Sequence, residues 1–175
     1  MCIRDSPYPA RVTSSSLTIG PATPDDHDGI AELTAGVYTA EGYASPEYAV
    51  QLADVAGRAD RATLLVARDP AGRLVGSVAL VLSGDFGEVT RSDDEAAFRM
   101  LVVDPAARGL GVGRALVQEC LDRARAAGKV RMVLSTDPRM TTAHRLYERL
   151  GFTRLPERDW SPAPGIDLRV YGLEL

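Results

Sequence analysis

The 175-residue chain lacks long apolar runs and carries no excess of positive charge. No apolar run approaches the roughly 18 residues that a membrane-spanning helix needs, and no signal-peptide pattern is present at its start. The formal net charge is −4 at pH 7 and the isoelectric point is about 5.2. This balance argues against non-specific binding to nucleic acid. We therefore expect no nucleic-acid partner, no membrane partner and a cytoplasmic location.

Cysteine and histidine are equally scarce, with two residues of each. Cys2 and Cys120 form neither a disulfide framework nor a zinc-binding spacing. His27 and His144 are too few for a histidine metal site, so we predict no metal. Cys120 falls on the apolar stripe of a predicted helix, which indicates a reduced residue of the core.

The composition is otherwise ordinary, with 45% apolar and 25% charged residues. The length suits one domain with a proper core. Residues 1–6, Met-Cys-Ile-Arg-Asp-Ser, resemble an in-frame translation of a sequencing-library adaptor, and we interpret them as a sequence artefact. Residues 7–15 carry Pro, Ser and Thr. We predict a disordered leader over residues 1–15 and a single domain over residues 16–175.

The most informative stretch runs from Glu95 to Gly113. Its bulky and β-branched residues from Phe98 to Val103 predict a buried strand, which Pro105 ends. Three glycines then follow within Arg108 to Gly113, at the start of a helix predicted from about Gly111 to Ala127. Such a turn lets a ligand approach the backbone, and the free amides of a helix N-terminus attract phosphate.

Two other phosphate-binding motifs fit this turn less well. A nucleoside-triphosphate loop would continue with Gly-Lys-Ser/Thr, but Arg114 and Ala115 stand there. The dinucleotide-binding fingerprint would need a third glycine at position 114 and a place on an early strand. A tight strand-to-helix turn without a ligand is the remaining alternative.

The rest of the chain alternates short strands with amphipathic helices. We predict strands at 17–19, 64–67, 74–82, 98–103, 130–135, 152–155 and 167–174, and helices at 24–37, 46–56, 111–127 and 139–150. The segments 83–94 and 158–165 are predicted to be loops.

Two motifs resemble markers of the GNAT superfamily of acyl-CoA-dependent N-acyltransferases. Arg108, Gly111 and Gly113 fill its pyrophosphate-binding signature, which reads Arg or Gln, two residues, Gly, one residue, Gly or Ala. Leu146-Tyr147 and Gly151-Phe152 match its second marker, a helix that bears Leu-Tyr and ends in Gly-Phe. The markers lie in the order of the family with one strand between them. On these motifs the chain is identified as a member of the superfamily.

The resemblance implies that residues 16–175 form a single N-acetyltransferase domain with an α/β (α+β) fold. Its mixed, mostly antiparallel sheet would have six to seven strands with splayed central strands, flanked by about four helices. Acetyl-CoA would be the co-substrate, with pantetheine in the gap between the splayed strands and diphosphate on the glycine turn. The cofactor-binding residues so implied are Leu101, Val102, Val103, Arg108, Gly109, Leu110, Gly111, Val112, Gly113 and Arg114.

For the chemistry, the resemblance implies that a neutral amine attacks the thioester directly, with a backbone amide near Val102 stabilising the oxyanion. Tyr147 stands where the family places the acid for the leaving thiolate; the alternative is a core tyrosine. The glutamate base of some members would share the face of Ala97, so Glu95, on the same face, is the candidate base. A solvated strand-end carboxylate or a water relay are the alternatives. Met140 replaces an asparagine that contacts the cofactor in many members.

The predicted function is transfer of an acetyl group from acetyl-CoA to a primary amine of a small molecule or a protein. The missing glutamate and asparagine leave a second hypothesis, a non-catalytic acyl-CoA-binding sensor. Candidate walls of the acceptor site are Tyr38, Tyr43, Arg99 and Asp159-Trp160. The sequence leaves the acceptor, the acyl-chain preference and a homodimer open.

Overall fold

The computed structural model describes residues 11–12, 16–84, 86 and 89–175. The predicted leader at residues 1–15, with the suspected artefact at residues 1–6, lies outside the described residues except for the backbone of Arg11–Val12.

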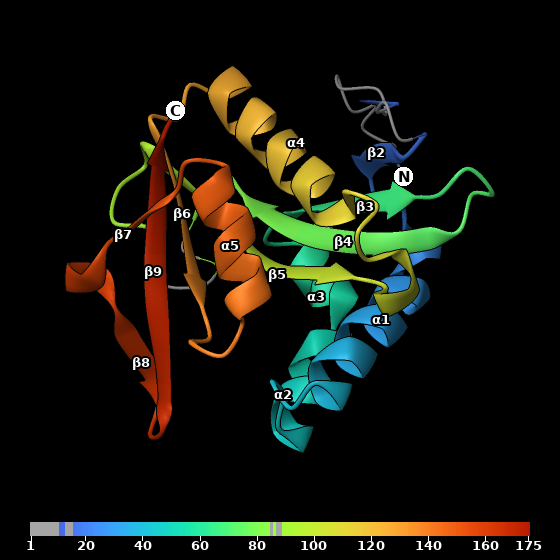
Figure 1. The fold of residues 1–175 in the computed structure, drawn as a ribbon, viewed down its shortest axis with the longest axis horizontal. Helices are drawn as coiled ribbons and strands as arrows, with labels where there is room; N and C mark the ends of the chain where they lie inside the picture. Colours follow the sequence, from blue (N-terminus) through green and yellow to red (C-terminus); the bar gives the residue numbers. More distant parts are fainter. Residues whose placement is uncertain (1–10, 13–15, 85, 87–88) are drawn as a thin grey trace.

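The described residues form nine strands and five α-helices (Figure 1). The strands are β1 (Arg11–Val12), β2 (Thr18–Pro21), β3 (Thr63–Arg68), β4 (Leu74–Val81), β5 (Glu95–Val103), β6 (Arg131–Thr136), β7 (Thr153–Arg154), β8 (Trp160–Ala163) and β9 (Ile166–Glu174). The helices are α1 (His27–Ala40), α2 (Pro46–Ala53), α3 (Val55–Ala59), α4 (Val112–Ala126) and α5 (Thr141–Arg149), with short 3₁₀ turns at Pro24–Asp26, Pro105–Ala107 and Pro156–Arg158.

The strands pair in the order β1-β2-β3-β4-β5-β6-β9-β7, and β8 pairs with β9. Every pair is antiparallel except β5 and β6, which run parallel and are joined through α4. The expected mixed, mostly antiparallel sheet is therefore confirmed. Among the described residues, β1 and β8 are strands in addition to those expected.

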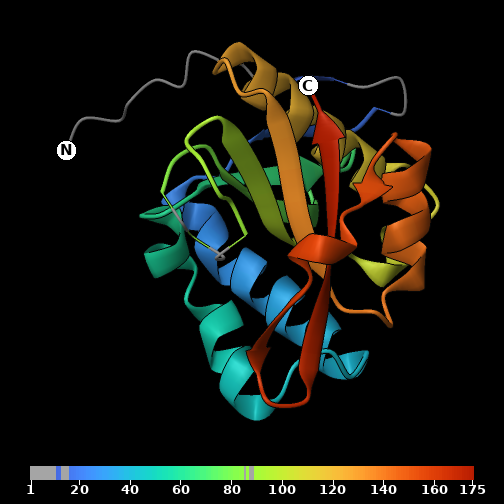
Figure 2. The same ribbon diagram turned by 90° about the vertical axis from the view of Figure 1, so that its left-hand side faces the viewer.

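Helices cover both faces of this sheet (Figures 1 and 2). α4 and α5 pack on one face, where Leu116, Cys120 and Tyr147 join Phe98 of β5 in the largest apolar cluster. α1 and α3 pack on the other face, where Ile30 and Val55 lie against strands β3 and β4. The apolar stripe of α4 is buried as its helical periodicity predicts.

The two central strands separate soon after they meet. β5 and β6 pair only from Glu95, opposite Arg131, to Ala97, opposite Val133. Beyond this point β6 continues beside β9 as far as Thr136, and β5 continues beside β4 alone. Figure 1 shows the two strands diverging below α5. The expected splay is present, and it begins at Ala97.

A β-bulge lies in β5 just after the divergence. Between the pairs Ser77–Val102 and Ala79–Arg99, one residue of β4 lies opposite two residues of β5, Met100 and Leu101. Within this bulge Met100 has a φ of +55°. A non-glycine residue in this region costs of order 1 kcal/mol or more and clusters at functional sites. The sequence pattern gave no sign of this bulge.

Two expected elements differ from the structure. The predicted helix over 46–56 is two helices, because Asp54 leaves the helical conformation with a ψ of 72° and its side chain caps α3 by accepting from the Gly57 amide. The predicted loop over 158–165 contains β8, which forms a hairpin with β9 through Gly165 at φ +80°. Pro162 is tolerated in β8 because this strand pairs with β9 alone among the described strands.

Gly76 of β4 lies under the first turn of α4. A Cβ at Gly76 would approach Val112 Cγ1 to 2.7 Å and Leu116 Cδ1 to 3.0 Å. We expect Gly76→Ala to lower the free energy of unfolding by about 1–3 kcal/mol, because the overpacked helix must shift. The matched control is Gly36→Ala in α1, where a Cβ meets nothing within 4 Å. This change should raise the free energy of unfolding by up to about 1 kcal/mol. Urea unfolding measures both; a Gly76→Ala protein as stable as the parent would contradict this packing.

Candidate active site

The glycine turn between β5 and α4 is open to approach. Gly109 and Gly111 both have a φ of +81°, and a Cβ at either position would meet no atom within 4 Å. Leu110 between them is 59% exposed. These two glycines are therefore required by the backbone conformation, and the turn faces open space rather than other parts of the protein.

Gly113 and Val112 have a different role in the same turn. A Cβ at Gly113 would lie 3.3 Å from Leu146 Cδ2 of α5, and the Val112 side chain is 2% exposed in the core. The third glycine of the motif thus lets α4 pack closely against α5. This packing holds the first turn of α4 at the end of β5.

The first turn of α4 offers an anion site. Gly111 is the N-cap residue, and the Ala115 amide donates to its carbonyl at 2.9 Å. The amides of Val112, Gly113 and Arg114 precede the first intrahelical donor, so they have no partner within the helix. Arg114 is exposed beside them. Free amides and the positive end of the helix dipole together favour a phosphate group.

Arg108, the charged residue of the turn, already has an anionic partner. Its Nη2 donates to the carboxylate of Glu41, which follows α1. The Arg108 side chain is 49% exposed, and that of Glu41 is 33% exposed. To bind an incoming diphosphate, Arg108 would therefore have to leave its half-exposed ion pair with Glu41.

A pocket of about 60 Å³ lies where β5 and β6 diverge. Phe98 to Leu101 of β5 and Leu134 to Thr136 of β6 line it, together with residues of the helices. From α5 come Ala143 and Tyr147, and from α1 on the opposite face comes Tyr38. Because helices from both faces reach the same pocket, it connects the two faces through the gap in the sheet.

Tyr147 lies in an aromatic cluster at this pocket. Its ring centroid is 5.8 Å from that of Phe98, 5.9 Å from Phe152 and 6.1 Å from Tyr171. The side chain is 5% exposed, and burial raises its pKa above the ordinary tyrosine value. It therefore stays protonated through the neutral range, as a hydrogen-bond donor must. This position is compatible with both roles considered from the sequence, the acid and the core tyrosine, since Tyr147 belongs to the core and also lines the pocket.

The segment after α1 joins the two sides of the pocket. The Tyr38 hydroxyl donates to the Leu101 carbonyl at 3.2 Å, so one backbone acceptor of the bulge has a partner. Tyr43 packs edge-on against Tyr38 with 6.4 Å between ring centroids. Arg139, before α5, lies over the Tyr43 ring and donates to the Gly42 carbonyl at 3.0 Å. Of the proposed acceptor walls, Tyr38 and Arg99 line the pocket and Tyr43 supports Tyr38.

Sequence reasoning did not identify Thr136 and His144. Thr136 lines the pocket at the end of β6, and His144 Nε2 lies 3.3 Å from its hydroxyl and 3.1 Å from the Asp137 carbonyl. Because a carbonyl only accepts, a hydrogen bond to Asp137 requires the tautomer in which this ring nitrogen carries the hydrogen. Burial lowers the pKa of His144, so the ring is neutral at pH 7. Met140 lines the pocket, with its sulfur 3.7 Å from the Thr136 hydroxyl.

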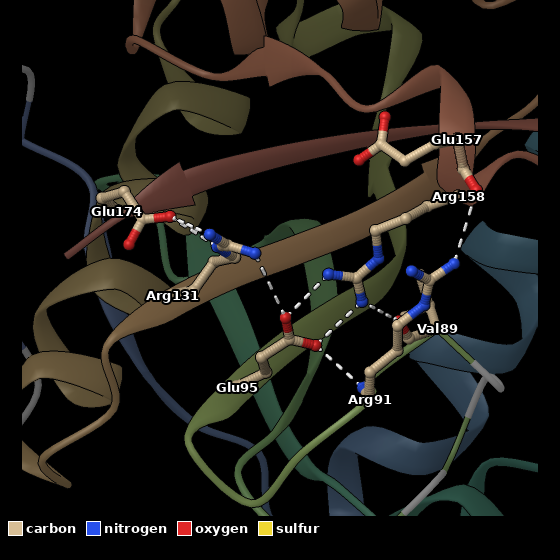
Figure 3. A network of polar contacts seen from close by, with 7 residues as sticks. All are labelled: Val89, Arg91, Glu95, Arg131, Glu157, Arg158 and Glu174. Atoms are coloured by element: carbon tan, nitrogen blue, oxygen red, sulfur yellow. Dashed lines mark hydrogen bonds and ion pairs between the residues drawn. The ribbon is translucent and has the colours of Figure 1, made fainter.

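Glu95, the candidate base, lies at the opposite end of β5 and does not line the pocket. Figure 3 shows its carboxylate facing Arg158, whose Nη1 and Nη2 donate to it at 2.7 and 2.8 Å. The Arg91 amide donates at 2.8 Å, and Arg131 Nη1 lies 3.6 Å away. The hydrogen bonds from Arg158 contribute most to holding the pKa of Glu95 below its ordinary value. A buried, paired carboxylate of lowered pKa is neither a solvated carboxylate nor a suitable base.

The Asp159-Trp160 pair is likewise occupied elsewhere. Asp159 accepts from both terminal nitrogens of Arg154 at 2.7 Å and from the Val170 amide at 2.8 Å. Trp160 packs against an apolar cluster that contains Val133 and Val170. Neither residue lines the pocket.

Other site types find little support in the part of the chain that the structure describes. It holds no group of three or more His, Cys, Asp or Glu side chains placed to bind a metal ion. None of its helices combines the length and apolarity needed to cross a membrane. A larger hollow of about 230 Å³ lies beside β7 and β9, lined by Leu155, Leu173 and the paired Arg131 and Glu174. It shares no lining residue with the pocket between β5 and β6.

Comparison with known proteins places these features in one family. The acetyltransferase (GNAT) family model matches residues 28–152. The chain is 32% identical over 112 residues to glucosamine 6-phosphate N-acetyltransferase of Trypanosoma brucei brucei, covering 62% of this chain and 73% of that protein. It is 29% identical to probable glucosamine 6-phosphate N-acetyltransferase 2 of Oryza sativa subsp. japonica, covering 91% of this chain and 90% of the relative. The structure of yncA from Salmonella typhimurium with acetyl-CoA is 25% identical, with a TM-score of 0.66 over 91% of this chain and 94% of that one.

The ion pair of Glu95 with Arg158 gives a prediction that separates a stabilising role from a catalytic one. Both side chains are buried, at 7% and 5% exposure. We expect Glu95→Gln to lower the free energy of unfolding at pH 7 by about 3 kcal/mol, because Arg158 keeps a buried, unbalanced charge. The rate of acetyl transfer per folded molecule should not change. Chemical unfolding and a rate normalised to folded protein measure the two effects.

The pH dependence has a defined sign. Because the folded-state pKa of Glu95 is lowered, its contribution is present above the ordinary glutamate value of about 4.3 and is lost as the pH falls through the lowered pKa. The stability difference should therefore shrink in acid. Glu174→Gln, which removes the 69% exposed partner of Arg131, is the control and should cost less than about 1 kcal/mol. If Glu95→Gln is as stable as the parent but loses much of the acetyl-transfer rate, Glu95 takes part in the reaction.

Proposed function

From its membership of the acetyltransferase (GNAT) family, which makes this chain an acetyl-CoA-dependent N-acetyltransferase, we propose that residues 16–175 form one catalytic domain around the gap between β5 and β6. The observation that carries this proposal is the pocket at the gap, which Tyr147 reaches from one face of the sheet and Tyr38 from the other. A thioester held on the α4–α5 face could then meet an amine that arrives from the α1–α3 face.

The proposed cofactor site follows the free backbone groups. The diphosphate lies on the amides of Gly111 to Arg114, with Arg108 as a further donor. The pantetheine arm lies along β5 from Leu101 to Val103, where the strand has lost β6 as a neighbour. Pantetheine contains amide groups, and these can pair with backbone donors and acceptors that would otherwise lack partners.

The proposed reaction is a direct transfer. The neutral amine nitrogen attacks the thioester carbon, and a backbone amide near Val102 stabilises the oxyanion. The carbon–sulfur bond then breaks, and the sulfur accepts a hydrogen bond or a proton from Tyr147. The nitrogen releases its proton to water or, through water, to the tyrosine oxygen, so that the charges balance. None of the described residues that line the pocket carries a carboxylate, and the proposed transfer uses no side-chain base.

The raised pKa of Tyr147 shapes its role. Burial disfavours the tyrosinate, whereas a thiol has an ordinary pKa of about 8.5. Complete proton transfer from tyrosine to thiolate is therefore uphill. We propose that Tyr147 acts mainly by donating a hydrogen bond to the sulfur as negative charge develops there, with the proton for the free thiol coming finally from the acceptor nitrogen.

The acceptor is a primary amine of a small molecule or a protein. The two relatives are named for glucosamine 6-phosphate, an amino sugar, which supports a small-molecule amine. The experiment that tests the function is thiol release from acetyl-CoA across a panel of primary amines, with acetyl-CoA binding measured in parallel by calorimetry. Binding without turnover on any amine would favour the non-catalytic sensor.

We expect Tyr147→Phe to lower kcat by roughly 10²-fold, because the developing thiolate loses its hydrogen-bond donor. The Kd for acetyl-CoA should change less than about threefold, since ground-state binding depends on the glycine turn. Steady-state kinetics and calorimetry measure the two constants. Tyr171→Phe removes a hydroxyl from the same aromatic cluster but outside the pocket, and it is the matched control. An equal loss in both variants would remove Tyr147 from the chemistry.

We expect Glu41→Gln to tighten acetyl-CoA binding by about two- to fivefold, because Arg108 no longer has to leave a carboxylate in order to meet the diphosphate. Calorimetry at low ionic strength measures the change, and added salt should reduce it. Glu32→Gln alters the net charge equally on the exposed face of α1 and serves as control. Weaker binding in Glu41→Gln would mean that Glu41 orients Arg108 for the cofactor instead of competing with it.

A further inference from the structure

Three arginines gather on the α1–α3 side of the pocket. Arg99 of β5 lines the pocket beside Tyr38. Its guanidinium carbon lies 4.6 Å from the ring centroid of Phe86, and that of Arg61 lies 4.2 Å from the same centroid. Arg58 of α3 is 4% exposed behind them. Arg58 lies in α3 and Arg61 just after it, whereas Arg99 lies on β5, so the fold brings two segments of the chain together.

None of the three has a carboxylate within ion-pair distance among the described residues. Arg58 donates through Nη2 to the Leu52 carbonyl, and its buried Nε has no hydrogen-bond partner there. Burial contributes most to the lowered pKa of Arg58, and the charge of Arg99 adds to it. The negative charge of Asp54 opposes this lowering of the Arg58 pKa, and the Asp54 side chain accepts a hydrogen bond from the Gly57 amide.

This arrangement contrasts with that of three other arginines, which have carboxylate partners. Arg108 is paired with Glu41, Arg139 with Asp137, and Arg158 with Glu95. Arginine is rarely buried without a partner, because an unbalanced charge in the interior is costly. Among the described residues no carboxylate pairs with these cations, so this cluster at the mouth of a pocket suits a ligand that supplies the negative charge.

We propose that the acetyl acceptor carries an anionic oxygen group, a carboxylate or a phosphate, that binds Arg99, with Arg61 and Arg58 reinforcing the positive field. The inference rests on the proposed function, since it places the amine of the same molecule in the pocket. The pocket is narrow, at about 60 Å³, so it admits the amine and leaves the anionic group outside beside Arg99. Guanidinium groups suit both anions, because their planar donors match carboxylate and phosphate oxygens in pairs.

The test compares amines that differ only in the anionic group. O-phosphoethanolamine is paired with ethanolamine, and β-alanine with β-alaninamide, in assays of thiol release from acetyl-CoA. We expect the anionic member of at least one pair to have a kcat/KM about tenfold or more above its neutral partner. The pair that shows the larger ratio distinguishes a phosphate from a carboxylate. Equal ratios near one in both pairs would overturn the inference.

Variants then assign the preference to Arg99. Arg99→Gln should reduce the ratio of kcat/KM for the anionic amine to that for the neutral amine by about tenfold or more. Arg99→Lys keeps the charge but loses the paired donors, so its ratio should lie between those of the parent and Arg99→Gln. Arg149→Gln removes one positive charge from the exposed surface of α5 and should keep the parental ratio. A ratio that Arg99→Gln leaves unchanged in a folded, acetyl-CoA-binding protein would overturn the assignment.

A binding arm keeps this inference separate from the proposed function. The protein saturated with coenzyme A is titrated with O-phosphoethanolamine and with ethanolamine, in the parent and in Arg99→Gln. If no amine supports turnover but the anionic amine binds tighter and loses this advantage in Arg99→Gln, the anion site stands and the acetyltransferase proposal fails. If turnover occurs without any anionic preference in rate or binding, the proposed function stands and the anion site fails.

Discussion

The loss of β6 as a neighbour of β5 after Ala97 is the constraint from which the active site follows. A strand in the middle of a sheet is normally satisfied on both edges, and each buried backbone group left without a partner is costly. The Tyr38 hydroxyl satisfies the Leu101 carbonyl, and the bulge at Met100 turns the strand at the same place. The remaining groups face a pocket instead of a strand, which makes the gap suited to an amide-bearing cofactor.

A strand with a bulge and one missing neighbour must be held from outside the gap. At its start, Glu95 is fixed by Arg158 and by the Arg91 amide. At its end, the glycine turn passes directly into α4, which packs against β4 at Gly76 and against α5 at Gly113. Because both ends are fixed, the unfavourable φ of Met100 persists in the middle. The glutamate that the sequence suggested as a base thus contributes by holding the strand that carries the site.

The sequence predicted those parts of the site that depend on local order, and it missed those that depend on distant partners. The glycine turn, the start of α4 and Tyr147 follow from residues within a few positions of one another, and each lies where the motifs indicated. Glu95 lies before the strand predicted at residues 98–103, although β5 in fact begins with it. Its partner Arg158 is 63 residues away, and no local pattern reveals the ion pair. The bulge is equally hidden, because Met100 is not a residue type that signals a positive φ. The β8 hairpin was missed because proline and glycine in residues 158–165 are as typical of a loop as of an edge strand.

Among the described residues that line the pocket, none carries a carboxylate and one is Arg99, and these two features have a common consequence. An alkylamine has an ordinary pKa of about 10.4, so at neutral pH most of it is protonated and cannot attack. A guanidinium close to the amine site disfavours the ammonium form and lowers that pKa, as any like charge does. A side-chain base would remove the proton from the amine after the amine has bound. A cationic wall instead favours binding of the amine that has already lost its proton. A carboxylate in the pocket would have the opposite effect, because it would stabilise the ammonium ion. The same arginines that would hold an anionic group of the acceptor therefore also favour the nucleophilic form of its amine, provided that the anion binds to Arg99 on the side away from the thioester.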